Sequence, residues 1–178
     1  DKLAWVKCLK NERRGRIGEY AEEFPRSTYH PAVVGESNAL WDVPAQCAFP
    51  SATQNELGSK DADNLVKGGL VLLAEGANMP TVPEARQRLI AGGVLYAPSK
   101  ASNAGGVAVS GLEMAQDMQL IQWSSARVDG RLQEIMRGIH DTVLRTAEEY
   151  GRPGNYVDGA NIAGFLKVAD AMLDESPI

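Results

Sequence analysis

The chain has 178 residues, of which 44% are hydrophobic and 23% charged, and its formal net charge is −5. These values are close to ordinary globular usage, so they exclude a disordered chain, a fibrous repeat and a disulfide-stapled miniprotein. The longest apolar runs fall far short of the ~20 residues that span a bilayer, so we expect no membrane partner. The negative charge also argues against a nucleic-acid partner.

The few cysteines and histidines of the sequence indicate a reducing environment and no metal. Cys8 and Cys47 have no motif spacing, which is typical of free thiols. Because no signal-peptide pattern opens the chain either, we expect a cytoplasmic location. His30 and His140 stand alone, so no metal site is expected.

A basic run near the start contrasts with the overall negative charge. Runs of this kind are most often a solvated helix face or a positive helix end, and we interpret it so. Its members are Lys7, Lys10, Arg13, Arg14 and Arg16.

Short apolar runs alternate with helical patterns through the middle of the chain. Residues 1–24 come first and are expected to form a helix that is broken near Gly15. The helix after the first apolar run should have Ser59 as its N-cap, and the helix after the second should begin at Pro83. The glycines at 92 and 93 should end that second helix. The three apolar runs, which we expect to be strands, are 45–49, 70–74 and 94–97.

Strands separated by single helices are typical of βαβ units, which give a parallel sheet with right-handed crossovers. Because the strand runs are apolar throughout, we expect helices on both faces of the sheet. A doubly wound nucleotide domain normally carries a Gly-x-Gly-x-x-Gly turn after its first strand, and no such turn precedes residue 45. The predicted fold class is therefore α/β: the later half of a Rossmann-like doubly wound parallel sheet, followed by a helical C-terminal tail.

After about residue 104 the pattern is helical only. Apolar residues recur every three or four positions along two stretches, so we expect two amphipathic helices that pack against the sheet domain. Ser125 should cap the first helix, and Gly151 with Pro153 should end it. The two predicted parts are a partial dinucleotide-binding domain, 1–122, and C-terminal helices packing on or between the domains, 123–178. The two stripes are Val128, Leu132, Ile135, Ile139 and Val143, and Ile162, Phe165, Leu166, Ala169, Met172 and Leu173.

The loops after the three strands are the places to look for a ligand site, because ligands of parallel α/β sheets bind beyond the carboxyl ends of the strands. The loops 50–57, 75–81 and 98–111 are rich in small residues, amides and hydroxyls. Small residues let the backbone approach a ligand, and amides complement a carboxamide such as nicotinamide. The alternative that these residues only supply turns and helix caps stays open. Asn103 is expected to cap a helix whose first turns include Ser110.

Five ungapped motifs resemble the hexameric glutamate dehydrogenases, especially the bacterial NADP-using type. They read RGRIGEY (14–20), ATQNEL (52–57), EGANMPT (75–81), KASNAGGVAVSGLEMAQ (100–116) and NYVDGANIAGF (155–165). The resemblance covers nearly the whole chain. It implies reversible oxidative deamination of L-glutamate to 2-oxoglutarate and ammonia by a homohexamer, with NADP as cofactor and NAD as the alternative.

The resemblance also implies roles for individual residues. In the family, the loops after the first two strands line the nicotinamide-ribose side of the cofactor cleft, which nominates Ala52, Thr53 and Asn78. The family asparagine that precedes Ala-Gly-Gly-Val meets the nicotinamide and the substrate, which nominates Asn103. Two further positions contact the substrate in the family, the serine through the γ-carboxylate, and they correspond to Val107 and Ser110.

Several functional residues of the family have no counterpart in this sequence. The family's catalytic lysine and acid/base aspartate lie in an N-terminal domain without a counterpart here, and Lys100 matches a different family lysine. We therefore expect the C-terminal part of a subunit, with no catalytic residue and no activity alone, because hydride transfer needs base and cofactor held together. Two alternatives remain: a non-catalytic Rossmann-like module for assembly or regulation, and a dehydrogenase of apolar amino acids, against which Ser110 argues.

Overall fold

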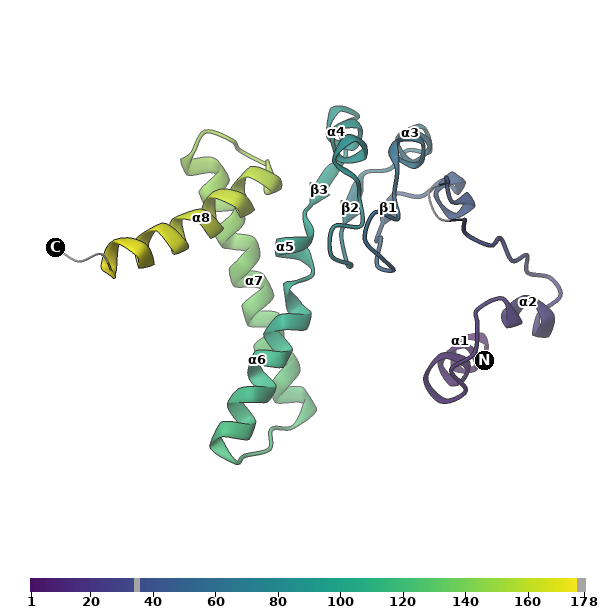
Figure 1. Ribbon diagram of the computed structural model, residues 1–178, viewed down its shortest axis with the longest axis horizontal. Coiled ribbons are helices and arrows are strands. Elements are labelled where there is room, and N and C mark those ends of the chain that lie inside the picture. Colours follow the sequence, from purple (N-terminus) through teal and green to yellow (C-terminus); the bar gives the residue numbers. More distant parts are fainter. Residues whose placement is uncertain (34–35, 176–178) are drawn as a thin grey trace.

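The computed structural model describes residues 1–33 and 36–175 of the chain. Figure 1 shows an elongated arrangement, in which a small sheet with two helices lies between an N-terminal helical segment and three long C-terminal helices. The order of elements in the middle is β1 (Cys47–Ala48), α3 (Ser59–Lys67), β2 (Leu72–Ala74), α4 (Pro83–Ala91) and β3 (Leu95–Ala97). The predicted alternation of strands and helices is confirmed.

The three strands form one parallel sheet in the order β1-β2-β3, which confirms the predicted α/β class. In register, Ala48 pairs with Leu73, and Leu73 pairs with Tyr96. A parallel bridge between Leu57 and Thr81 continues the connection beyond the carboxyl ends of β1 and β2. The strand-end loops are thus joined to each other as well as to the sheet.

Helices α3 and α4 lie side by side and bury one face of the sheet (Figure 1). Pro83 is the first residue of α4, as predicted, and the helix ends before Gly92. The following Gly93 has φ +80°, a conformation that glycine adopts without strain. The predicted N-cap of α3 is wrong by one residue: Gly58 is the N-cap, and its N–H donates to the Asp61 carboxylate at 2.8 Å.

The core of this unit consists of side chains from the sheet, α3, α4 and the segment before β1. Leu73 at the centre of the sheet and Leu89 on α4 are fully buried. Burying one such side chain contributes about 1.5–3 kcal/mol to folding. The members of the core are Trp41, Ala48, Leu57, Ala62, Leu65, Leu70, Leu73, Ala85, Leu89, Val94 and Tyr96.

The opposite face of the sheet differs from the prediction that both faces are covered. Phe49 and Leu95, which are next to the buried Ala48 and Tyr96 in the sequence, are 60% and 44% exposed. Both crossover helices lie on one face because the strands follow one another in the order of the sequence. From the C-terminal part of the described chain, α8 (Tyr156–Asp174) contacts β3. The apolar composition of the strands therefore predicted a cover that residues 1–33 and 36–175 supply only in part.

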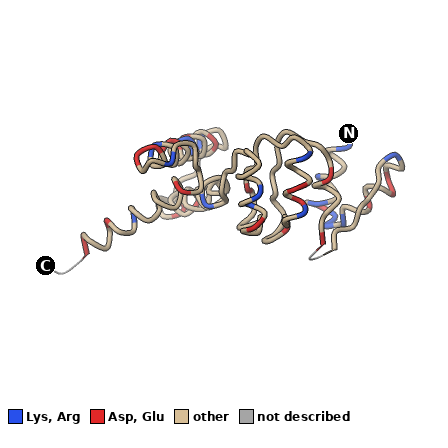
Figure 2. Tube along the Cα trace, turned by 90° about the horizontal axis from the view of Figure 1, so that it is seen from above, with Lys and Arg blue, Asp and Glu red and all other residues tan. Residues whose placement is uncertain are grey.

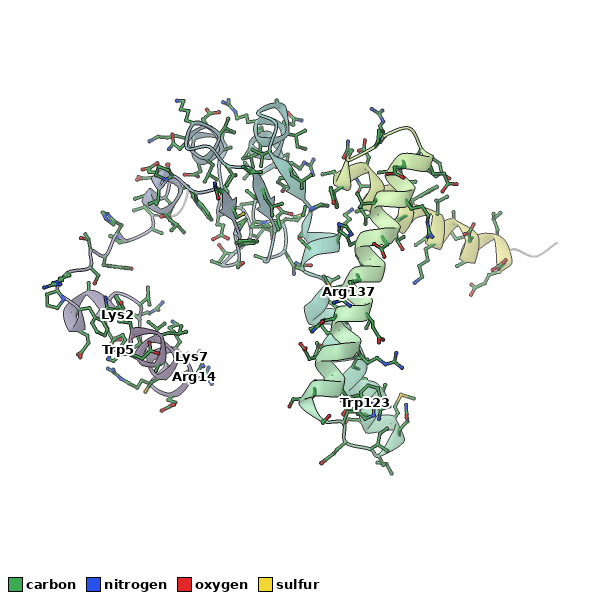
Figure 3. All side chains as sticks on the ribbon, turned by 180° about the vertical axis from the view of Figure 1, so that it is seen from behind. Lys2, Trp5, Lys7, Arg14, Trp123 and Arg137 are labelled. Carbon is green, nitrogen blue, oxygen red and sulfur yellow. The ribbon has the colours of Figure 1, made fainter. Side chains whose placement is uncertain are left out.

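The N-terminal segment contains α1 (Lys2–Lys7), a π-helical stretch (Cys8–Glu12) and α2 (Glu19–Glu23), so the predicted break near Gly15 is confirmed. A Cβ on Gly15 would lie 2.3 Å from Leu9 Cδ1, so the close approach there requires glycine. Trp5, which is labelled in Figure 3, packs edge-on against Tyr20 across the break, with ring centroids 5.8 Å apart. A short 3-10 helix (Ala39–Asp42) leads from this segment toward β1.

The basic run lies on α1, the π-helical stretch and the turn after it, so it is only partly a helix face. Arg13 forms an ion pair with Glu19 at 3.0 Å, and Lys10 Nζ donates to Gly15 O at 3.1 Å. Arg14 has φ +56°, which places it at the turn that ends the helix. Figure 2 shows basic and acidic residues interspersed along the rest of the chain.

The C-terminal part contains α5 (Ser99–Ser102), α6 (Ala104–Gln119), α7 (Ser125–Glu149) and α8. The predicted N-cap of α7 is again one residue late: Ser124 is the N-cap, and its hydroxyl accepts from Arg127 N at 3.3 Å. The two stripes pack on each other and on the preceding part of the chain: α7 contacts α5, α6 and α8, and α8 also contacts β3. The outer end of α8 keeps its apolar residues exposed; Phe165, Met172 and Leu173 are each at least 70% exposed. No helix within 1–33 or 36–175 is long and apolar enough to cross a membrane.

The packing of α8 on α7 depends on Gly159. An added Cβ there would lie 2.3 Å from Val143 O, a backbone atom that cannot move by itself. Gly159→Ala should therefore destabilise the protein by about 1–3 kcal/mol, the cost of overpacking, and lower the melting temperature in calorimetry. The matched control is Gly164→Ala on the same helix, where an added Cβ meets nothing within 4 Å. An equal effect of both substitutions would contradict this packing.

Candidate functional site

The loops after β1 and β2 form one continuous backbone structure. Gly76 N and Ala77 N donate to Pro50 O at 2.9 and 3.1 Å. A Cβ on Gly76 would lie 2.3 Å from Ser51 Oγ and 3.0 Å from Ser51 Cβ, so a larger residue there would require Ser51 to shift. The two loops therefore hold a fixed relative position at the carboxyl edge of the sheet.

Two residues without the freedom of glycine adopt left-handed backbone conformations in these loops. Asn55 has φ +56° and Met79 has φ +48°, and Asn55 N donates to Met79 O at 2.9 Å. Asparagine tolerates this region, but methionine does so at a cost. Strained backbone persists where the surroundings impose it, and such positions cluster at functional sites.

The loop after β3 is joined to the loop after β2 by the amide of Asn103. Its Nδ2 donates to Asn78 Oδ1 at 2.6 Å and to Ala77 O at 3.1 Å. Asn103 occupies the N-cap position of α6, as predicted, but its side chain makes no capping hydrogen bond. The amide serves the neighbouring loop because Ala77 and Asn78 supply two acceptors within its reach.

The structure thus brings together two of the residues nominated for the cofactor, although 25 positions separate them in the sequence. Within the described residues, Asn78 Nδ2 and Asn103 Oδ1 have no hydrogen-bond partner. The pair therefore presents one amide donor and one amide acceptor at the ends of the strands. This combination fits the carboxamide of a nicotinamide, which also offers one donor group and one acceptor.

A buried carboxylate lies directly behind the amide pair. Glu75, the residue after β2, is 4% exposed. Its Oε1 accepts from the Tyr96 hydroxyl and from Thr81 N at 3.3 Å, and its Oε2 accepts from Ser99 N at 2.7 Å. Buried polar groups are costly unless they are hydrogen-bonded, and this one is bonded from three directions.

The protonation state of Tyr96 matters for this network because the phenol must remain a donor. Burial raises the pKa of the Tyr96 hydroxyl well above its usual range, and the hydrogen bond to Glu75 raises it further. Tyr96 therefore stays protonated at neutral and moderately alkaline pH. Its ring belongs to the core under α4, so the sheet itself holds the donor in place.

Sequence reasoning quoted Glu75 as part of a motif but did not nominate it. The signal was present: an acidic residue immediately follows an apolar run that was expected to be a buried strand. A buried acid requires donors. Their identity was out of reach because Ser99 and Tyr96 lie more than 20 residues along the chain.

The other nominated residues are exposed on the loop after β1 and on α6. Ala52 and Thr53 are exposed in the turn after β1, where Ala52 N donates to Glu56 Oε1 at 3.0 Å. Val107 and Ser110 are exposed on α6, and their spacing of three places them on one face of the helix. Ser110 Oγ donates to Gly106 O at 3.2 Å.

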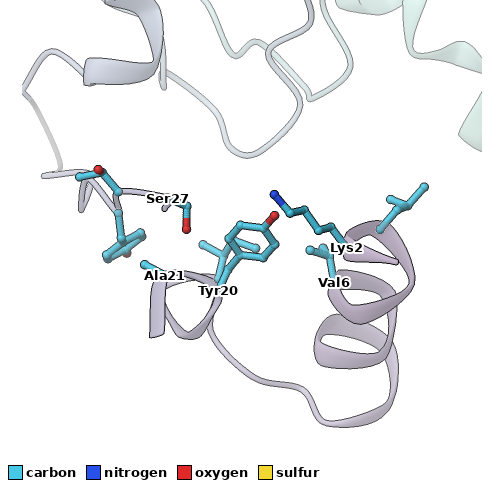
Figure 4. A pocket seen from close by; sticks show the side chains of 9 residues that line it. Lys2, Val6, Tyr20, Ala21 and Ser27 are labelled. Atoms are coloured by element: carbon cyan, nitrogen blue, oxygen red, sulfur yellow. The ribbon is translucent and has the colours of Figure 1, made fainter. Parts of the chain in front are cut away.

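Two hollows of the described chain are lined by residues other than the nominated ones. An apolar hollow of about 370 Å³ lies between α1 and α2, lined in part by Val6 and Tyr20 (Figure 4). A more polar hollow of about 530 Å³ lies at the start of α3 and includes Asn55 and Gly58. In the part of the chain that the structure describes, no three His, Cys, Asp or Glu side chains form a metal-binding group. The nominated site is therefore an open surface of loops and one helix.

Lys100, which matches a family lysine other than the catalytic one, serves a structural contact. Its Nζ donates to Asn161 Oδ1 on α8. This contact connects α5, which leads to Asn103, with the C-terminal helices.

Comparison with known proteins places this arrangement in a family. Residues 2–176 match the family described as Glutamate/Leucine/Phenylalanine/Valine dehydrogenase. Because the match includes nearly the whole chain, the protein belongs to this family.

Individual relatives are similar over a defined part of their length. The NADP-specific glutamate dehydrogenase of Giardia intestinalis is 49% identical over 178 residues, which include 98% of this chain and 38% of the relative. The NADP-specific glutamate dehydrogenase of Escherichia coli strain K12 is 48% identical, over 100% of this chain and 38% of the relative. A crystal structure of Plasmodium falciparum glutamate dehydrogenase matches with a TM-score of 0.90 at 42% identity, over 99% of this chain and 37% of that chain. The chain thus spans well under half the length of these relatives.

Proposed function

We propose that the full-length protein containing this chain is a glutamate dehydrogenase, which oxidatively deaminates L-glutamate to 2-oxoglutarate and ammonia, and catalyses the reverse reaction. The observation that carries this proposal is the Asn78–Asn103 amide pair, which offers a donor and an acceptor at the carboxyl ends of the strands. The similarity to enzymes named NADP-specific glutamate dehydrogenases supports the substrate and NADP as cofactor, with NAD as the alternative.

In this proposal, each nominated residue has a binding or orienting role. The amides of Asn78 and Asn103 hold the nicotinamide carboxamide, and the turn at Ala52 and Thr53 lies against the adjoining ribose. When bound, the cofactor accepts the hydride that leaves the α-carbon of glutamate. The chain itself fixes the plane of the amide pair, and therefore the face that the ring presents to the substrate.

Val107 and Ser110 contact the substrate in this proposal, as the family resemblance implies. Both point away from the described chain on α6, so a substrate can reach them. The Ser110 hydroxyl donates to a helix carbonyl in this structure and can rotate toward a γ-carboxylate. A hydroxyl there favours glutamate over an apolar amino acid, whose side chain gains nothing from it.

The remaining features of the proposal concern the whole protein. We propose that residues 1–122 are part of a dinucleotide-binding domain and that residues 123–178 are helices that pack on or between domains. The open site and the uncovered sheet face support a further part of the protein that closes over them, with the catalytic base on that part. A cytoplasmic homohexamer follows from the family resemblance, and the free thiols of Cys8 and Cys47 agree with a reducing compartment.

The most direct test of the proposed function compares two purified proteins. The full-length protein should reduce NADP in the presence of L-glutamate, followed by absorbance of the reduced cofactor. The 178-residue chain alone should not, because no proton-transferring lysine and aspartate accompany the cofactor surface. Turnover by the isolated chain, or none by the full-length protein, would overturn the proposal.

The substrate role of Ser110 predicts a change in selectivity. Ser110→Ala in the full-length protein removes one hydrogen bond to a charged group, worth about 1.5–3 kcal/mol. Activity on glutamate, measured as kcat/KM, should fall roughly ten- to a hundredfold, since each ~1.4 kcal/mol is a factor of ten. Activity on norvaline, which has no γ-carboxylate, should change little.

Ser110→Thr, which keeps the hydroxyl, is the matched control and should retain most of the preference for glutamate. If Ser110 acts only within α6, both substrates should be affected alike by the alanine substitution. An unchanged ratio of the two activities would remove Ser110 from the substrate site.

A further inference from the structure

We propose that Glu75 is the positioning residue of the cofactor site, because its buried carboxylate fixes the geometry of the Asn78–Asn103 pair. This inference rests on the proposed function for its kinetic consequences, but the geometric claim stands by itself. Glu75 does not touch the nominated ligand surface, and it acts through the segments that carry the two asparagines.

The three donors to Glu75 belong to the segments that determine where the amides lie. Thr81 N closes the loop that begins at Glu75 and carries Asn78. Ser99 N is the first N–H of α5, the four-residue helix that leads directly to Asn103. The carboxylate therefore holds both ends of one asparagine's loop and the beginning of the other's helix.

The third donor fixes the carboxylate to the core. The Tyr96 hydroxyl donates to Glu75 Oε1 from β3, where the ring is 5% exposed. The backbone carbonyl of Glu75 accepts from Ser102 Oγ at 2.6 Å, so α5 is attached at its end as well as at its beginning. A displacement of Glu75 would consequently be transmitted to α5 and to Asn103.

The side chain at position 75 must accept hydrogen bonds on both of its terminal atoms and donate none, because its three partners are all donors. Within the described residues no Lys or Arg nitrogen lies within 4 Å of the carboxylate, so its partners are uncharged donors. An ionised carboxylate can accept all three hydrogen bonds on its two oxygens. In Glu75→Gln, the Nε2 group must face either Ser99 N or Thr81 N, and in both orientations a side-chain donor meets a backbone donor. The variant keeps the size of the side chain but loses at least one of the hydrogen bonds that the Glu75 carboxylate accepts.

A purely structural role for Glu75 is the competing explanation, and a double-mutant cycle separates the two. The cycle consists of Glu75→Gln, Asn103→Ala and the double variant in the full-length protein. Melting temperature and kcat/KM for NADP are measured for each. Residues that act as one unit give non-additive losses, whereas independent contributions multiply.

If Glu75 acts by positioning Asn103, each single variant should lose about tenfold or more in kcat/KM for NADP, and the double variant should lose no more than the worse single variant. The control is Glu84→Gln, a matching substitution of an exposed carboxylate on α4, which should leave the kinetics unchanged. Losses that multiply in the double variant, or a lower melting temperature with unchanged kinetics, would overturn the proposal.

A second variant keeps the test valid if Glu75→Gln does not fold. Tyr96→Phe removes one donor and leaves the two backbone donors in place. Its loss in kcat/KM should be smaller than that of Asn103→Ala, and it should disappear in the Asn103→Ala background. If Tyr96→Phe lowers kcat/KM equally in the presence and in the absence of Asn103→Ala, the positioning role of Glu75 is contradicted.

The geometric claim is tested separately from the enzymatic one by a crystal structure of the Glu75→Gln or Tyr96→Phe protein. Asn103 Nδ2 should move out of hydrogen-bond distance of Asn78 Oδ1, which it approaches to 2.6 Å here. An unchanged amide pair would refute the positioning role whether or not the protein oxidises glutamate. A displaced pair in the variant, together with no glutamate oxidation by the unsubstituted full-length protein, would instead refute the proposed function alone.

Discussion

The hydrogen bonds to the buried carboxylate of Glu75 are the interaction on which the strand-end surface depends. They connect β3, the loop after β2 and the start of α5, three segments that the parallel sheet brings to one edge. Each lost hydrogen bond to a charged group costs about 1.5–3 kcal/mol, and a buried carboxylate cannot replace it with water. A fully bonded network of this kind selects one arrangement of the loops over its alternatives.

Local rules of sequence reading accounted for much of the fold. The strands, Pro83 at the start of α4 and the helix break near Gly15 follow from apolar runs and from backbone chemistry that acts within a few residues. The two cap errors, at Ser59 and Ser125, have one cause. In both cases the preceding residue also favours the N-cap position, so composition cannot choose between neighbours.

The rest could not be predicted because it depends on distant partners. Apolar strands require a cover, but the pattern does not say which part of a protein supplies it. Phe49 and Leu95 are exposed here for that reason. Likewise, Asn103 has the residue type and position of a helix cap, yet two acceptors 25 and 26 residues away in the sequence take its amide. The resemblance nominated the site residues, whereas the network that holds two of them became visible only in three dimensions.

The measurement that tests this account most directly is a crystal structure of the full-length protein with NADP bound. The account predicts that the nicotinamide carboxamide lies within about 3 Å of the amide groups of Asn78 and Asn103, with the Glu75 network intact beneath them. A nicotinamide bound away from the carboxyl ends of β1, β2 and β3, with no contact to either amide, would contradict it.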